Sequence, residues 1–422
     1  MMRILLAFFI ALLPMAAVAS EPVQPKAPKP ILSRAVPIRH ITPGIEVLLS
    51  DRLELLAGKR VALLSNQTGV NRKGVRNIDL LRAHPAINLV ALFSPEHGVR
   101  GVAQAGEKVA SGLDSKSGLP VHSLYGDTKM PTAKMMQGID IVLVDLQDIG
   151  TRFYTYSTTL LYMLRAAETS GAEVIVLDRP NPLGGMMIEG PVLEPAFASF
   201  VGSFAMPVRH AMTFGELAQM FVGEDKLRTR LHIIPMRGWY RNLTPYAGWD
   251  LPWVPPSPNM RSPKTAAVYP GTALFEGTNI SEGRGSEKPF EYIGAPFIDG
   301  RALAKRLNAM GLPGVAFEPA SFKPDFSKYA GQDCHGVWVI PTNSKTFHPF
   351  RTGIALVKTV HDMYPDKFEF HPGTPAFFEQ LAGTDSVRKG ILEGKSVSDI
   401  ERQWQPELDA FMSLRARYLI YS

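Results

Sequence analysis

The feature that most constrains the fold is an alternation of short apolar runs with helix-like stretches in the first half of the chain. The apolar runs are residues 60–65, 87–93, 119–124, 139–146 and 173–177. The segments between them have room for a helix, and the clearest prediction is residues 155–170, which Gly171 ends. Repeated strand–helix units of this kind build a parallel sheet, so the sequence predicts an α/β fold with a Rossmann-like domain.

Polar clusters follow four of these runs, at residues 65–69, 94–98, 145–152 and 178–182. Parallel strands all end at the same edge of a sheet, and ligands of open α/β sheets bind in the crevice beyond that edge. The loops expected at the opposite edge, such as residues 83–85, are plain turns. The sequence therefore predicts one cleft formed by four strand ends.

Glu96 is the first candidate for catalysis, because it follows an apolar strand directly and precedes His97 and Gly98. Partial burial at a strand end would raise the pKa of its carboxyl group toward the value that a general acid needs. The alternative is a structural carboxylate that caps its loop or pairs with Arg100. His97 either polarises Glu96 or binds a ligand, or else bonds to a backbone carbonyl, and both interpretations stay open.

The first 19 residues have the pattern of a secretory signal peptide. Arg3 supplies a positive start, residues 4–13 form a short apolar core, and residues 17–19 are a small-x-small cleavage site. The apolar run is too short to span a bilayer, and no cysteine is present there for a lipid anchor. We expect an exported, periplasmic protein without stable membrane insertion.

The mature chain is long enough for two domains. Of the 422 residues 45% are hydrophobic, and with Cys334 as the single cysteine no intramolecular disulfide can form. A net charge of +6 without a long basic run does not indicate nucleic-acid binding. We predict a Pro-rich lead-in at residues 20–40, a catalytic Rossmann-like domain at 41–205, and a smaller α+β domain at 206–422 whose irregular region, 238–297, covers the cleft.

Four segments together resemble the exo-β-N-acetylmuramidases that trim peptidoglycan sugars. They are FSPEHGVRG at 93–101, DLQDIGTRFYTY at 145–156, LDRPNPLGG with the following EGP at 177–191, and the segment from YPGTALFEGTN to GAPF at 269–297. The resemblance implies a Rossmann-like domain beside a smaller one, and a hydrolase that releases a terminal β-linked N-acetylmuramic acid from the non-reducing end of a peptidoglycan fragment. The family's catalytic glutamate corresponds to Glu96.

The second catalytic group is less defined, because glycoside hydrolysis usually needs two groups. Asp148 is the best-placed protein candidate, since Asp145 belongs to the strand and is expected to be buried. Alternatively the acetamido oxygen of the substrate attacks the anomeric carbon, and Asp148 only orients it. The sequence leaves both open.

Several further residues are candidates for substrate binding. Arg152 is expected near a helix entry and could bind the lactyl carboxylate of muramic acid, or could instead tie Asp145 or Asp148 in place. Arg284 is a second candidate for that carboxylate, with Glu282 and Glu287 as hydroxyl acceptors or ion-pair partners. Tyr154, Tyr156, Trp249 and Trp253 offer aromatic faces to sugar rings. Asn66, Asn181 and Asn279 are further candidates for substrate binding, because their amide side chains lie in the segments 65–69, 178–182 and 269–297.

No cofactor or metal is expected, since motifs such as HExxH, a Walker loop and GxGxxG after the first strand are missing and the His97, His122, Asp145 and Asp148 set has no diagnostic spacing. The rival interpretation from another class is a periplasmic receptor that binds a muropeptide or sugar without cleaving it. An esterase or amidase using the same cleft is a third. The oligomeric state is not predicted.

Overall fold

The structure is a computed structural model that describes residues 40–245 and 249–422. These residues all belong to one unit, residues 37–422, and every contact and cavity discussed below lies within it. The predicted signal peptide, residues 1–19, and all but the last residue of the predicted lead-in lie outside the described residues. No helix in the described part combines the length and the apolar character needed to cross a membrane.

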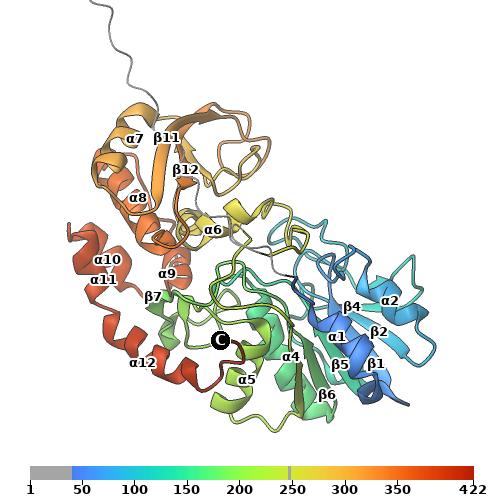
Figure 1. Cartoon of the computed structure of the whole chain (residues 1–422). Helices are drawn as coiled ribbons and strands as arrows, with labels where there is room; N and C mark the ends of the chain where they lie inside the picture. The colour runs from blue at the N-terminus through green and yellow to red at the C-terminus, as the bar shows by residue number, and fades with distance from the viewer. Residues whose placement is uncertain (1–39, 246–248) are drawn as a thin grey trace, which may run out of the picture. The chain divides into compact units, whose positions relative to one another are not determined.

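A seven-stranded sheet forms the first domain (Figure 1). Its strand order is β3–β4–β2–β1–β5–β6–β9, and every neighbouring pair is parallel except β3 with β4. The parallel strands thus follow the 3-2-1-4-5-6 order of a Rossmann fold, which confirms the predicted fold class. The strands are β1 (Arg60–Ser65), β2 (Asn88–Ser94), β3 (Gly112–Leu113), β4 (Pro120–Ser123), β5 (Ile141–Asp145), β6 (Glu173–Leu177) and β9 (Leu231–Ile234).

Alternate residues of each central strand serve opposite faces of the sheet, as the two-residue period of a strand requires. Val61 and Leu63 of β1 join the core beneath the first helices, whereas Ala62 and Leu64 join the core shared with later helices. The first group comprises α1 (Gly44–Asp51), the 3-10 helix η1 (Leu53–Leu56) and α2 (Asn77–Ala83); the later group comprises α3 (Ala133–Met136), α4 (Tyr156–Ser170) and α5 (Phe214–Glu224). Burial on both faces explains why the strands are almost continuously apolar.

The predicted convergence of the polar clusters is confirmed by the register of the strands. Ser65 at the end of β1 pairs with Asp145 at the end of β5, and the neighbouring Leu64 pairs with Phe93 near the end of β2. β6 continues the same parallel register beside β5. All four clusters therefore start at one edge of the sheet.

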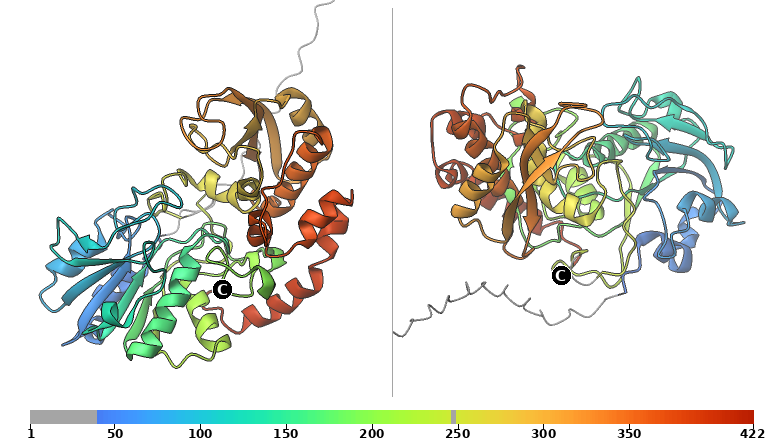
Figure 2. Two further views of the ribbon diagram at one scale, coloured as in Figure 1. Left: turned by 180° about the vertical axis from the view of Figure 1, so that it is seen from behind. Right: turned by 90° about the horizontal axis from the view of Figure 1, so that it is seen from above.

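The second domain is built on a three-stranded antiparallel sheet of order β10–β12–β11. Figure 2 shows helices packed against this small sheet, and α6 and α8 contact one another closely. The strands are β10 (Tyr292–Ala295), β11 (Val315–Phe322) and β12 (Cys334–Pro341). The helices are α6 (Pro263–Thr272), η3 (Ala273–Gly277), α7 (Gly300–Ala309), α8 (Pro349–Met363), α9 (Phe377–Ala382), α10 (Ser386–Leu392), α11 (Val397–Arg402) and α12 (Gln405–Ala416).

A small hairpin lies between β6 and α5 along the chain. β7 (Glu189–Val192) pairs antiparallel with β8 (Pro207–Arg209), and η2 (Pro195–Phe197) lies between them. Beyond α12 the chain returns to the first domain, where the Tyr421 hydroxyl donates to Asp178 at 2.7 Å. Arg241 also pairs with Glu216 of α5, which in turn accepts the backbone N–H of Ile420.

Two boundary predictions are wrong. The first domain does not end at residue 205, because β9 pairs with β6 and completes the large sheet. The region 238–297 is not wholly irregular, since it contains α6, η3 and β10. Near the end of the chain α11 and α12 are separate helices, because Pro406 lies in the first turn of α12, where a proline is tolerated, but could not continue α11.

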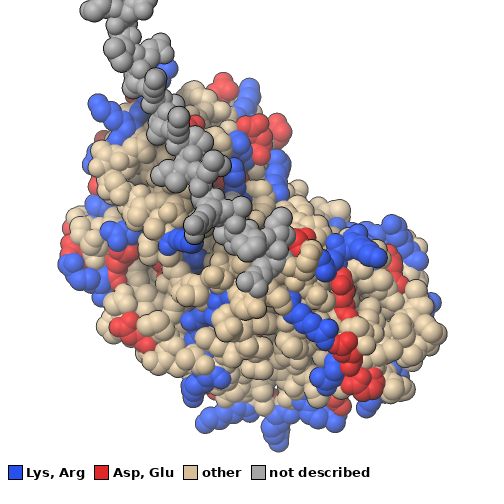
Figure 3. All heavy atoms as spheres, in the orientation of Figure 1, with Lys and Arg blue, Asp and Glu red and all other residues tan. Residues whose placement is uncertain are grey.

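Charged side chains of both signs are mixed over the face of the molecule drawn in Figure 3, with lysine and arginine most frequent along its lower margin. This mixture agrees with the modest net charge of +6.

Candidate active site

A cavity of 780 Å³ opens at the carboxyl edge of the large sheet and is closed on its far side by the second domain. The loop after β2 supplies Glu96 and His97, the loop after β4 supplies Tyr125, and the segment entering α4 supplies Tyr154 and Thr155. From the second domain come Tyr269 of α6, Glu276 of η3, Glu282 and Arg284 before β10, Lys328 between β11 and β12, and Gln380 of α9. The cavity is large enough for a sugar-sized ligand.

Glu96 is buried and held by donors that carry no charge. Its carboxylate accepts the hydroxyl of Thr155 at 2.7 Å and the backbone N–H of Gly106 at 3.0 Å. Burial, together with the charge and a hydrogen bond of Glu96, raises the pKa of Tyr125. No lysine or arginine among the described residues forms an ion pair with Glu96, so its hydrogen-bond donors are all neutral.

His97 adopts a left-handed backbone conformation with a φ of 72°, and the residue lines the cavity. Its Nδ1 lies 2.8 Å from the carbonyl oxygen of Ala103. A carbonyl can only accept, so Nδ1 carries the proton and Nε2 carries the lone pair of the neutral ring. Burial lowers the pKa of His97 although the charge of Glu96 opposes the shift, and a neutral ring follows.

Aromatic rings form one wall of the cavity. Tyr269 packs against Phe153, Tyr154 and Phe290, with ring centroids 5.5, 6.0 and 4.7 Å apart. Tyr125 and Phe200 form a second pair, 5.6 Å apart. Aromatic faces beside a carboxylate are suited to the apolar faces and hydroxyl edges of a sugar ring.

A cluster of paired charges lies on the side of the second domain. Arg284 donates to Glu276 at 3.0 Å and lies 3.4 Å from Glu282. Lys328 donates to Glu282 at 3.0 Å and to two backbone carbonyls, those of Phe275 and Ile280. Burial acts to lower the pKa of Arg284, but the two carboxylates outweigh burial and raise it. Glu276 and Glu282 therefore both have cationic partners within the protein, Arg284 and Lys328.

Arg152 does not reach the cavity, which contradicts its predicted role. Its side chain is fully buried and donates to the carbonyl oxygens of Pro191, Met206 and Leu381, at 2.8, 2.9 and 2.7 Å. Burial lowers the pKa of Arg152 to about 9. Gly383, which ends α9 with a φ of 83°, lies against the guanidinium, where any Cβ atom would collide with it. Arg152 thus ties the hairpin to α9.

Asp148 also lies outside the residues that line the cavity. One of its oxygens accepts the backbone N–H of Gly150 at 2.7 Å and lies 3.6 Å from Nε2 of the buried His210. The charge of Asp148 contributes to a raised pKa of Tyr154, although burial contributes most. Asp148 therefore does not line the cavity, which does not fit its predicted role as the second catalytic group.

The three candidate asparagines have structural partners. Asn66 donates to the hydroxyl of Tyr156 at 2.7 Å, and Tyr156 in turn donates to the carbonyl of Pro256 at 2.5 Å, so both are buried away from the cavity. Asn181 donates to the carbonyl of Met212, and Asn279 to that of Lys367. This placement does not support the predicted binding roles of the three asparagines or of Tyr156.

Of the remaining candidates, Tyr154, Glu282 and Arg284 line the cavity, and Glu287 does not. Glu287 is exposed and accepts the hydroxyl of Tyr292 at 2.9 Å. Trp249 and Trp253 line a separate, narrow pocket beside Arg179. The structure therefore brings Glu96, His97, Tyr154, Glu282 and Arg284 together and leaves the other predicted residues apart.

Among the residues of the site that were not predicted are Tyr125, Thr155, Glu276 and Lys328. Thr155 and Glu276 lie inside two of the segments that carry the family resemblance, so the sequence held a signal for them. Tyr125 follows the short strand β4, where the same rule that indicated Glu96 applies. Lys328 lies in the loop between β11 and β12 and had no sequence signal.

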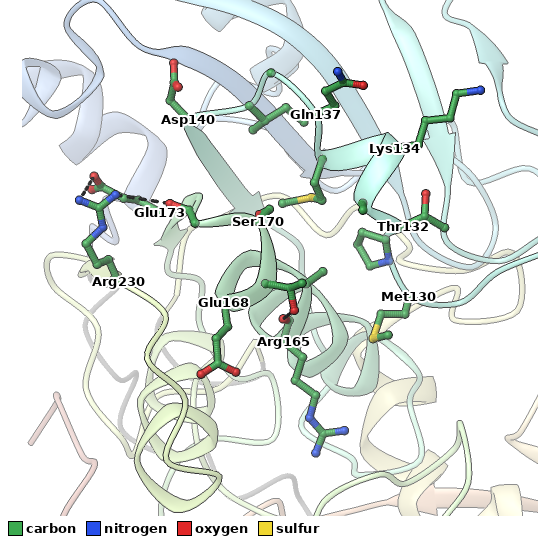
Figure 4. Close-up of a pocket in the computed structure, with 18 of the residues that line it drawn as sticks. Met130, Thr132, Lys134, Gln137, Asp140, Arg165, Glu168, Ser170, Glu173 and Arg230 are labelled. Carbon is green, nitrogen blue, oxygen red and sulfur yellow. Dashed lines mark hydrogen bonds and ion pairs between the residues drawn. The ribbon is translucent and has the colours of Figure 1, made fainter.

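A larger cavity, of 1450 Å³, lies at the opposite, amino edge of the sheet (Figure 4). Its charged side chains satisfy one another: Arg60 pairs with Asp140, Arg165 with Asp225, and Arg230 with Glu173. Among the described residues, this cavity has no counterpart of Glu96 and His97, a carboxylate without an ion-pair partner next to an imidazole. The smaller cavity is therefore the better candidate site. In the part of the chain that is described, no three His, Cys, Asp or Glu side chains gather as a metal-binding group.

The fold and the smaller cavity together define a two-domain α/β protein with an acid-bearing, aromatic-walled pocket. The family described as "Exo-beta-N-acetylmuramidase NamZ, N-terminal" matches residues 61–264, and its C-terminal counterpart matches residues 267–421. The chain belongs to this NamZ family, as the resemblance of its motifs implies.

Comparison with individual proteins gives the same family. The chain is 49% identical to the peptidoglycan β-N-acetylmuramidase NamZ of Bacillus subtilis (strain 168), over 90% of this chain and 91% of that one. Two crystal structures of DUF1343 family proteins from Bacteroides fragilis share the fold. One has a TM-score of 0.84 at 36% identity and the other a TM-score of 0.72 at 31% identity, and each alignment covers 90% of this chain and 99% of the other.

Proposed function

We propose that this protein is an exo-acting glycoside hydrolase that releases terminal, non-reducing β-linked N-acetylmuramic acid from peptidoglycan fragments. The observation that carries the proposal is Glu96, a buried carboxylate in a sugar-sized cavity that has no ion-pair partner in the described part of the chain. The relative from Bacillus subtilis that is named a peptidoglycan β-N-acetylmuramidase supports the same substrate.

In this proposal Glu96 donates a proton to the glycosidic oxygen as the bond to the leaving sugar breaks. Of the three glutamates that line the cavity, Glu276 and Glu282 form ion pairs with Arg284 and Lys328. Glu96 accepts hydrogen bonds only from neutral donors, so protonation of its carboxylate breaks no ion pair. The lone pair on Nε2 of His97 is available to a substrate hydroxyl or to water.

The nucleophile is then either water, activated by a second protein group, or the acetamido oxygen of the substrate. A chromogenic β-N-acetylmuraminide whose N-acetyl group is replaced by N-trifluoroacetyl distinguishes the two routes. Fluorine weakens the acetamido oxygen as a nucleophile, so kcat should fall steeply if that oxygen attacks and should change little otherwise. The anomer released first, followed by NMR, separates retention from inversion.

The central test compares the wild type with Glu96→Gln on a chromogenic β-N-acetylmuraminide and on a disaccharide with a terminal muramic acid. We expect the substitution to lower kcat by about 10²- to 10⁴-fold, because it removes the transferable proton but keeps the shape of the side chain. The matched control is Glu168→Gln, which removes a carboxylate from the other cavity. Full activity of Glu96→Gln would refute the assignment, and binding without turnover by the wild type would favour the receptor interpretation.

We also propose that the protein is exported and acts in the periplasm. The support is the charge, apolar core and small-x-small pattern of residues 1–19. Expression of the full chain in a Gram-negative host, followed by fractionation and N-terminal sequencing, tests this. A mature protein beginning near residue 20 in the periplasmic fraction is expected, and an uncleaved cytoplasmic protein would contradict it.

A further inference from the structure

Muramic acid differs from glucosamine by a lactyl ether that ends in a carboxylate. If the protein acts on N-acetylmuramic acid, as proposed above, a cation in the cavity that binds this carboxylate would distinguish the two sugars. Three side chains with a permanent positive charge line the cavity: Lys129, Arg284 and Lys328. Arg152, the first candidate from the sequence, is buried elsewhere.

Two of these three cations are already used by the protein. All three donors of the Lys328 ammonium have partners, namely Glu282 and the carbonyls of Phe275 and Ile280. Arg284 is shared between Glu276 and Glu282. A substrate carboxylate placed there would meet two protein carboxylates, and like charges at that distance repel.

Lys129 is different, because within the described residues no carboxylate lies at ion-pair distance from its ammonium group. The ammonium lies over the ring of Phe200, 4.3 Å from its centroid, and 5.5 Å from the centroid of Tyr125. Both rings line the cavity. The aromatic faces hold the cation in place without neutralising its charge.

The position of Lys129 suits a group attached to the sugar that is cleaved. Tyr125 links the two parts of the site, since its ring contacts the ammonium of Lys129 and its hydroxyl is hydrogen-bonded to Glu96. A lactyl arm extends from the ring of the same sugar whose glycosidic bond Glu96 would protonate. One aromatic side chain therefore separates the proposed acid from the unpaired cation.

We propose that Lys129 binds the lactyl carboxylate of the terminal N-acetylmuramic acid and thereby sets the specificity of the site. This proposal rests on the proposed function, because it assumes a muramic acid in the cavity. The exposed position of Lys129 allows its substitution without loss of core packing.

The test compares a chromogenic β-N-acetylmuraminide with the same compound whose lactyl carboxylate is a carboxamide. Wild type should prefer the carboxylate by about 10- to 100-fold in kcat/KM, which is the usual strength of a charge-assisted hydrogen bond. Lys129→Met keeps the aliphatic contact with Phe200 but should lose this preference, and Lys129→Arg should keep most of it. The matched control is Lys288→Met, because Lys288 lies 4.1 Å over the ring of Trp338 and does not line the cavity.

Binding measured by calorimetry separates this proposal from the proposed function. N-acetylmuramic acid and its carboxamide are titrated into Glu96→Gln and into Glu96→Gln with Lys129→Met. A carboxylate preference that depends on Lys129 supports the proposal even if wild type hydrolyses neither compound, in which case the hydrolase assignment alone fails. An unchanged preference in the Lys129→Met variant, or no preference in wild type, overturns the role of Lys129.

Discussion

The chemistry of a single carboxylate in this cavity depends on what its neighbours donate. Glu96, Glu276 and Glu282 share one site, yet only Glu96 is held by a hydroxyl and a backbone N–H without a cation. The sequence indicated Glu96 from its place at a strand end, but nothing in the sequence showed that Thr155 would donate to it. The tertiary structure supplied that partner from the start of α4.

The neutral ring of His97 leads to a prediction about catalysis that a single substitution tests. Asparagine tolerates the left-handed conformation that His97 adopts, so His97→Asn should fold with a free energy of unfolding within about 1 kcal/mol of wild type. We expect kcat/KM on the muraminide to fall about 10- to 100-fold, because the lone pair on Nε2 is lost. Unchanged kinetics would assign the ring to the support of the Ala103 loop alone.

Arg152 leads to the opposite expectation, a loss of stability without a change in specificity. Arg152→Met leaves three buried carbonyl oxygens without their donor and should lower the free energy of unfolding by about 3–5 kcal/mol. Urea unfolding followed by tryptophan fluorescence measures the loss. The KM of the folded fraction should stay near that of wild type. A selective rise in the KM for muraminides would instead show that Arg152 takes part in substrate binding.

At the scale of elements, strands and capped helices were predictable and a helix rich in special residues was not. β1 and β6 have the predicted bounds, and α4 ends at Ser170 before Gly171, as predicted. α6 was missed because Pro270 and Gly271 are typical of loops. In the structure Gly271 lies against the carbonyl of Pro349 in α8, where any Cβ atom would collide, so the glycine allows the two helices to pack closely.

The segment after α12 is an element whose role only the fold reveals. The Tyr421 hydroxyl donates to Asp178 and accepts the backbone N–H of Met236, so it fastens the chain end to the strands β6 and β9. Tyr421→Phe should lower the free energy of unfolding by about 1–2 kcal/mol and speed amide exchange at Met236. Identical urea midpoints for the variant and wild type would show that this anchoring contributes nothing.

For the whole molecule, two buried carboxyl groups make stability depend on pH. Burial raises the pKa of Glu189 to about 7 and that of Asp178 to about 6. In the unfolded chain such groups titrate near about 4, so between about pH 4 and pH 7 the folded state binds more protons. Their stabilising effect is complete below about pH 4 and is lost as the pH rises to about 7.

Glu189→Gln tests this sign. Urea unfolding at pH 5 and pH 8 should show a smaller loss of stability with rising pH in the variant than in wild type, by at most about 3 kcal/mol. The remaining slope should be that of Asp178 together with the other groups whose pKa values are shifted, all of which the substitution leaves in place. A variant with the full wild-type slope would show that Glu189 is already ionised in the folded protein at pH 5.

The sequence by itself determined the α/β class, the order of the strands along the chain, the edge at which chemistry gathers, and Glu96 as the first catalytic candidate. These follow from local rules, because apolar period, caps and strand ends are properties of neighbouring residues. Only the tertiary structure decided that β9 belongs to the large sheet and that Arg152 and Asp148 lie outside the cavity. It also decided that Lys129 has no carboxylate partner among residues 40–245 and 249–422. Burial and pairing depend on residues far apart in the chain, which no local pattern records.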